Sequence, residues 1–149
     1  MSDLSHVDEG TGDVRMVDVG DKPLSRRRAV ARGRVRMAAA TAERLRKLPK
    51  GDALAVARIA GIQAAKRTSE LIPLCHPLPL TVVEVTLEVD GDGVAIEASA
   101  ETTAQTGVEM EALTAVAVAG LTVYDMAKAI DKTMQLDEIV LVSKTKEPT

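Results

Sequence analysis

Aromatic residues are nearly absent from this chain: its 149 residues include no tryptophan, no phenylalanine and one tyrosine, Tyr124. Aliphatic side chains must therefore build the core. Proteins that read single-stranded nucleic acids stack bases on aromatic rings, and one tyrosine cannot form such a platform. The scarcity of rings argues against a nucleic-acid-binding function.

Cysteine and histidine are also scarce. Cys75 is the only cysteine, so no intramolecular disulfide can form, and two histidines with one cysteine fall short of a zinc-ligand set. We expect no cofactor and no metal site, and magnesium accompanying a phosphate ligand is left open. The N-terminus lacks the basic start and apolar stretch of a signal peptide, and the longest apolar run, residues 112–121, is shorter than the ~20 residues that span a bilayer. We expect a soluble, cytoplasmic protein.

Charge is unevenly distributed along the chain. The net charge is −3, yet eight of the eleven arginines lie within residues 26–46, where Glu43 is the only acid. Residues 101–138 carry seven acids and two lysines. A local basic patch suits an anionic ligand such as a phosphate ester, or an acidic face of a neighbouring subunit, and it is equally compatible with a solvated surface.

The hydrophobic pattern predicts a single domain over residues 1–149, with residues 1–13 as a flexible arm. Small and apolar residues alternate with arginines in residues 29–37, which indicates a strand packed closely under a helix. The remaining predicted elements are helices at 38–48, 52–67 (with Asp52 as N-cap) and 107–132, a hairpin of strands 81–89 and 94–100, and a last strand at 137–143. This β-α-α-β-β-α-β order predicts an α+β fold, a ferredoxin-like sandwich with a four-stranded antiparallel sheet and an additional helix.

The predicted helix at residues 107–132 is apolar on every face through its middle, except for Thr114. A helix buried all round needs cover on both sides. Because one four-stranded sheet covers one side, we expect a second subunit to cover the other.

A proline-rich segment, Leu71–Leu80, holds Cys75 and His76 on stiff, irregular backbone, which suits a site. A structural loop histidine is an equal alternative for His76. A thiol-protease pair is disfavoured, because sequence neighbours on extended backbone point in opposite directions.

Two groups on the long predicted helix could carry chemistry. Asp125 and Lys128 share a helix face, either as a surface ion pair or, beside a buried helix, as an acid/base pair in a cleft. Glu109 and Glu111 flank Met110 in the first turn, where they favour the helix dipole or could accept hydrogen bonds from a guanine-like N–H edge.

Four lysines stand at the edges of predicted elements, where phosphate-contacting lysines often occur, although each one is more commonly solvated surface: Lys50, Lys66, Lys128 and Lys144. No P-loop or Gly-x-Gly-x-x-Gly pattern is present. A phosphate would therefore be held by side chains.

Three long blocks carry a resemblance to a known family. They are Lys-Gly-Asp followed by Ala-Arg-Ile-Ala-Gly-Ile-Gln-Ala-Ala-Lys-Arg-Thr within residues 50–68, Glu-Leu-Ile-Pro-Leu-Cys-His-Pro-Leu at 70–78, and Thr-Gly-Val-Glu-Met-Glu-Ala-Leu-Thr through Leu-Thr-Val-Tyr-Asp-Met-Ala-Lys at 106–128. With Met-Val-Asp-Val at 16–19, the match covers almost the whole chain. The sequence closely resembles the cyclic pyranopterin monophosphate synthase family of molybdenum cofactor biosynthesis.

The resemblance implies a lyase that converts 3′,8-cyclo-7,8-dihydroguanosine 5′-triphosphate, made by a preceding radical GTP cyclase, into cyclic pyranopterin monophosphate with release of pyrophosphate. It also implies a homohexamer, built as a trimer of dimers, with active sites at dimer interfaces. Neither a nucleic acid nor a membrane is implied as a partner.

Carried over by motif, Asp125 would be the catalytic acid/base residue, with Lys128 as its partner and Lys50 as a further catalytic group. The substrate-binding residues would be Leu74, Cys75, His76, Met110, Glu111, Lys66, Lys144 and Arg27, the last assigned by its spacing from residues 17–19. Family members commonly continue after the last strand with Gly-Gly-Lys-Ser-Gly, whereas this chain has Lys-Thr-Lys-Glu-Pro-Thr at 144–149, in which Lys146 is a candidate substitute.

Two other functions are compatible with the residues. One is a non-catalytic oligomeric module that binds a purine nucleotide through the same loop and lysines. The other is an RNA-binding ferredoxin-like domain that uses the arginine-rich strand, which the missing aromatics disfavour.

Overall fold

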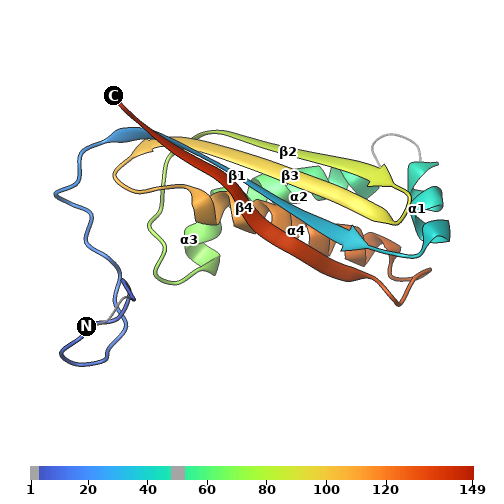
Figure 1. Ribbon diagram of the computed structural model, residues 1–149, viewed down its shortest axis with the longest axis horizontal. Coiled ribbons are helices and arrows are strands. Elements are labelled where there is room, and N and C mark those ends of the chain that lie inside the picture. Colours follow the sequence, from blue (N-terminus) through green and yellow to red (C-terminus); the bar gives the residue numbers. More distant parts are fainter. Residues whose placement is uncertain (1–3, 48–52) are drawn as a thin grey trace.

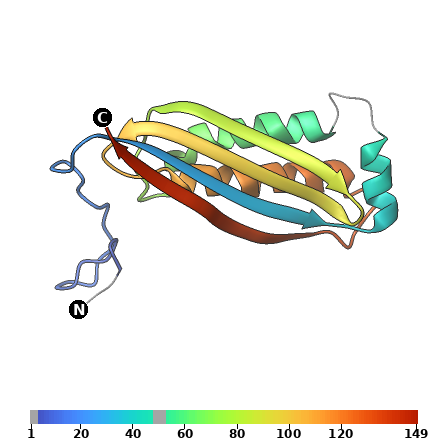
Figure 2. The same ribbon diagram turned by 45° about the horizontal axis from the view of Figure 1, so that its top comes forward.

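A computed structural model describes residues 4–47 and 53–149. Its elements run β1 (Ser25–Arg36), α1 (Ala39–Arg46), α2 (Ala53–Lys66), α3 (Thr68–Leu71), β2 (Leu80–Asp90), β3 (Gly93–Ala104), α4 (Glu109–Ala127) and β4 (Gln135–Pro148). The four strands form one antiparallel sheet in the order β2-β3-β1-β4. Helices α2 and α4 cover one face of this sheet (Figures 1 and 2). The predicted α+β class and four-stranded antiparallel sheet are confirmed, and α3 is a one-turn helix that the sequence pattern did not reveal.

Strand β1 shows the predicted alternation, because Ala29, Ala31 and Val35 are fully buried while the arginines between them face away from the helices. A Cβ built on Gly33 would lie 2.6 Å from Cγ1 of Val116 on α4. A larger side chain there would push the helix away. The strand begins four residues earlier than predicted, since Ser25 pairs with both neighbouring strands.

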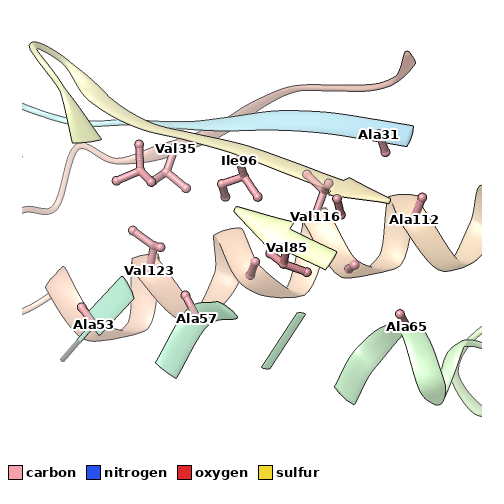
Figure 3. Close-up of a cluster of buried hydrophobic side chains, with 14 of the residues drawn as sticks. Ala31, Val35, Ala53, Ala57, Ala65, Val85, Ile96, Ala112, Val116 and Val123 are labelled. Atoms are coloured by element: carbon pink, nitrogen blue, oxygen red, sulfur yellow. The ribbon is translucent and has the colours of Figure 1, made fainter. Parts of the chain in front are cut away.

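Helix α4 is shorter than the predicted 107–132, and α2 of the same chain supplies its second cover. A Cβ on Gly61 of α2 would lie 3.0 Å from the Ala115 carbonyl oxygen and 3.3 Å from the Ala119 Cβ. Small residues thus let the two helices touch, and the core between them and the sheet is aliphatic (Figure 3). The inference that a second subunit must provide this cover was wrong, because it left the neighbouring predicted helix out of account.

Length and composition alone would allow α4 to cross a membrane, and in the described part of the chain no other helix passes this test. The expectation that no segment approaches such a length rested on the shorter run at 112–121. Helix α4 instead packs under the sheet of its own chain, with Ala112, Val116 and Val123 almost completely buried. This is the pattern of a core helix.

Strand β4 extends well beyond the predicted 137–143 and forms one edge of the sheet. Four consecutive apolar side chains on it, Ile139–Val142, are 38–51% exposed. Soluble proteins rarely leave an apolar edge strand unprotected, because it invites pairing with another chain. Lys144, predicted at the end of a strand, lies within this one.

Helix α1 sits at the end of the sheet opposite the N-terminal arm (Figure 1). The Asp131 carboxylate, after α4, accepts hydrogen bonds from the Ala38 N–H (3.0 Å) and the Thr41 hydroxyl (2.9 Å). The Thr133 hydroxyl and N–H donate to the same carboxylate, and their bonds, together with those from Ala38 and Thr41, hold the pKa of Asp131 well below its usual range. The predicted N-cap Asp52 lies outside the described residues.

Residues 4–24, which precede β1 and which we call the arm, leave the sheet at the end of the molecule where α3 lies (Figure 1). The arm contains a turn closed by an isolated bridge between Val7 and Val14, with the Asp8 side chain accepting hydrogen bonds from the backbone of Gly10 and Thr11. The flexibility expected of residues 1–13 stays a prediction.

Candidate functional site

A cavity of about 820 Å³ lies between the N-terminal arm, the loop Ile72–Pro79 and the first turn of α4. Its volume is in the range that holds small-molecule ligands. Four of the predicted substrate-binding residues line it: Leu74, Cys75, His76 and Met110. The structure thus brings together residues from two separate sequence blocks.

The loop from Ile72 to Pro79 has no helix or strand, as its prolines predict. The His76 Nε2 donates a hydrogen bond to the Val17 carbonyl oxygen in the arm (2.6 Å). The Cys75 Sγ lies 4.0 Å from Oε2 of Glu111. Because the two neighbours turn to different partners, they do not form a catalytic thiol–imidazole pair.

Glu111 is the most unusual charged residue of this region, since it is only 2% exposed and its Oε1 atom has no hydrogen-bond partner among the described residues. Burial, together with the nearby Glu109 carboxylate, raises the pKa of Glu111 to about 7. The same burial, with Glu111 adding negative charge, raises the pKa of the Cys75 thiol. Glu111, a predicted substrate-binding residue, lines neither cavity and lies behind the cavity-lining Cys75. A buried acceptor without a partner has the chemistry to bind an N–H group, provided that the cavity wall opens toward it.

Glu111 also makes a testable contribution to stability. Its carboxyl binds a proton more tightly in the folded chain than in the unfolded one, so the free energy of unfolding should fall as pH rises from about 4.5 to about 7. Glu111→Gln, which cannot ionise, should remove up to about 3 kcal/mol of this decline. Urea unfolding at pH 5 and pH 8, at one protein concentration, measures it. Equal pH dependence in both proteins would contradict the burial of this carboxyl.

A second cavity, of about 290 Å³, adjoins the first and shares Lys22 and Gly107 with it. Five cationic residues line it, and no acidic residue does among those described: Lys22, Arg27, Arg28, Lys144 and Lys146. We call it the basic pocket. Arg28 alternates to the other face of β1, where its Nε lies 3.9 Å from the Glu101 carboxylate. The guanidinium and ammonium groups that remain to bind phosphate oxygens are those of Lys22, Arg27, Lys144 and Lys146.

Arg27 is the buried member of the basic pocket, with 8% of its surface exposed. Its Nη2 donates to the Gln105 carbonyl oxygen (3.3 Å), and its Nε has no partner among the described residues. Lys144 is held by the Glu109 carboxylate at 2.7 Å. The structure therefore places two of the predicted phosphate-binding residues together, with Lys146 beside them.

Sequence reasoning missed Lys22 and Arg28. Lys22 falls in none of the predicted elements and in none of the matching sequence blocks, although it stands just before the strand that carries Arg27. The period-two pattern of β1 also puts Arg27 on the same face as Ala29, a signal that could have separated it from the outward-facing Arg26.

The predicted catalytic pair lies elsewhere. The Lys128 Nζ is 2.7 Å from the Asp125 carboxylate, which raises the pKa of Lys128, but the two side chains are 58% and 67% exposed. They therefore do not occupy a cleft within one chain. Fifteen residues of α4 separate Asp125 from Met110, a distance of about 22 Å along the helix axis.

The remaining predicted residues do not join either cavity in the single chain. Lys66 is exposed at the end of α2 and lines neither one. Lys50 lies outside the described residues. Within residues 4–47 and 53–149, no three His, Cys, Asp or Glu side chains gather closely enough to hold a metal ion.

Comparison with known proteins gives one consistent result. A sequence model described as the MoaC family matches residues 16–147. The chain is 59% identical to a protein of Thermomicrobium roseum over 97% of its own length and 89% of the relative's, and 61% identical to one of Roseiflexus castenholzii over 97% and 94%. It is 57% identical to a protein of Dinoroseobacter shibae over 97% and 93%. Each of these relatives is named cyclic pyranopterin monophosphate synthase.

Proposed function

The chain belongs to the MoaC family, and on that premise we propose that it converts 3′,8-cyclo-7,8-dihydroguanosine 5′-triphosphate into cyclic pyranopterin monophosphate with release of pyrophosphate. It is a lyase of molybdenum cofactor biosynthesis. Its substrate comes from a radical GTP cyclase. The structural observation that supports this function is an apolar cavity that adjoins a basic pocket.

The larger cavity receives the fused rings of the substrate. Leu74 and Met110 offer apolar walls, and the stiff loop fixes Cys75 and His76 against the arm. The Oε1 atom of Glu111, which has no partner among the described residues, accepts a hydrogen bond from a ring N–H or amino group once the Cys75 side chain in front of it moves aside. Leaving that acceptor unpaired costs about 1–3 kcal/mol, so a ligand that supplies a donor recovers this energy.

The basic pocket receives the triphosphate. Forming the cyclic phosphate expels pyrophosphate, and negative charge builds up on the leaving oxygens in the transition state. Arg27, Lys144 and Lys22 are placed to neutralise it. We propose that any magnesium enters with the phosphates and that the protein carries no resident cofactor.

Proton transfers for rebuilding the purine into a pterin are assigned to Asp125 and Lys128, with Lys50 as a further catalytic group. Because Asp125 stands about 22 Å from Met110 along α4, we propose that it serves the cavity of another copy. The assembly is a homohexamer, a trimer of dimers, in which Lys66 likewise reaches a site shared between subunits. Exposed apolar residues on β4 and at the end of α4, Leu121, Met126 and Ile130 among them, support contact between copies. We place the enzyme in the cytoplasm.

Incubation with the cyclised GTP intermediate should yield one pyrophosphate per pterin, detected by the fluorescence of the oxidised product. Because the phosphates meet exposed lysines, KM should rise as ionic strength increases, while kcat changes less. Binding of the intermediate without any pterin would contradict the assignment and favour a non-catalytic nucleotide-binding module. Heat-denatured protein serves as the control.

A further inference from the structure

Gln105 lies in the short connection between β3 and α4 and contacts two separate parts of the site without lining either cavity. Its side-chain Nε2 donates a hydrogen bond to the Gly20 carbonyl oxygen in the arm (3.2 Å). Its own backbone carbonyl accepts the bond from Nη2 of Arg27 (3.3 Å). One residue therefore joins the arm to the buried arginine.

Both contacts lead to cations of the basic pocket. Gly20 stands two residues before Lys22, and Lys22 lines both cavities. The Gly20 N–H donates a hydrogen bond to the Asp18 side chain (2.8 Å). Three residues upstream of Gly20, the His76 imidazole holds the Val17 carbonyl. Two hydrogen bonds thus hold segment 17–22 against the rest of the chain, one from the His76 imidazole and one from the Gln105 side-chain amide.

We propose that Gln105 is a positioning residue that holds Lys22 beside Arg27, so that both cations meet the same phosphate chain. This inference rests on the proposed function of the basic pocket. Lys22 is exposed on the arm. Without the Gln105 hydrogen bond, the arm would become ordered only when the ligand binds, and the lost conformational entropy would weaken the affinity. The hydrogen bond from Gln105 orders the arm before the ligand arrives and thereby strengthens phosphate binding, although Gln105 does not contact the ligand.

Gln105→Met tests this inference, because methionine keeps the length of the side chain and removes its N–H donor. We expect the Kd for inorganic pyrophosphate and the KM for the substrate each to rise about 3- to 10-fold, the loss of one hydrogen bond's contribution, with kcat changed less than 2-fold. Thr103→Val, at an exposed position two residues earlier, is the matched control and should leave both constants unchanged.

A double-mutant cycle with Lys22→Met separates positioning from a general loss of structure. In the Lys22→Met background, Gln105→Met should have almost no further effect on pyrophosphate binding, since the cation that it positions is gone. Additive effects, unchanged affinity in Gln105→Met, or a fall in kcat at constant KM would each overturn the inference. If Gln105→Met folds poorly, Gln105→Ser provides the same cycle.

Hydrogen exchange adds a readout that does not depend on turnover. Amides of residues 17–22 should exchange faster in Gln105→Met than in the unmodified chain, while those of β3 stay unchanged. Equal protection of residues 17–22 in the two proteins would contradict the role of the Gln105 side chain in ordering the arm. If instead the proposed function is wrong, the unmodified chain will form no pterin, whatever the double-mutant cycle shows.

Discussion

Asp125→Ala is expected to reduce pterin formation by roughly 10²- to 10⁴-fold, the usual contribution of a general acid or base. The variant should fold normally, because the Asp125 side chain is 67% exposed and its recorded partner is Lys128, one turn away. An exposed ion pair of this kind adds little to stability. Turnover of the cyclised GTP intermediate, with circular dichroism and light scattering for fold and assembly, measures both parts.

Glu88→Gln, at an exposed carboxylate on β2, is the control and should leave turnover unchanged. Mixing tests whether Asp125 serves another copy. Subunits carrying Asp125→Ala and subunits carrying Arg27→Met should each lose most of their activity. After subunit exchange the mixture should regain part of it, because some sites then take Arg27 from one subunit and Asp125 from another, both intact. Normal turnover in Asp125→Ala, or mixed assemblies that stay inactive after demonstrated exchange, would contradict the shared site.

Arg27→Met is expected to lower kcat/KM by roughly 10²- to 10³-fold, because it removes the buried guanidinium of the basic pocket, which we propose binds the phosphates. Methionine fills a similar volume in the sheet, so the fold should persist. Kinetics with the cyclised GTP intermediate and calorimetry with inorganic pyrophosphate should show parallel losses.

The neighbouring Arg26 offers a matched control. It lies on the opposite face of β1, its side chain is 68% exposed, and it pairs with Glu147 at 3.7 Å. Arg26→Met removes the same charge one residue away and should change kcat/KM less than 2-fold, given the small worth of exposed ion pairs. Equal effects of the two substitutions would mean that general electrostatic attraction, and not the basic pocket, binds the phosphates. Lys144→Met, at a pocket residue on β4, should behave like Arg27→Met.

Local patterns in the sequence were enough to predict most of the fold. The alternation in β1 and in the β2–β3 hairpin gave the strands and their buried faces, because side chains on a strand point alternately to either side. Element ends were less predictable. Strand β4 runs to Pro148 because β1 offers partners along its whole length, and α4 ends at Ala127 although the apolar pattern continues to Ile130.

The residues of the candidate site were likewise predictable from the sequence only in part. Sequence blocks predicted Cys75, His76, Met110 and Glu111 as site residues, and the structure groups the first three around one cavity with Glu111 buried behind Cys75. No pattern showed that Lys22 belongs with Arg27, since an exposed lysine in a polar arm looks like any other. Their proximity depends on how the arm folds back.

By itself the sequence determined the family, the α+β class and the stiff loop that carries Cys75 and His76, because these depend on residue type and short-range spacing. Only the tertiary structure decided that α2 covers α4, that one oxygen of Glu111 has no partner among the described residues, and that the Asp125–Lys128 pair is exposed at the far end of α4. Such features depend on contacts between residues far apart in the chain. Burial and pairing arise from those contacts, and a linear pattern does not contain them.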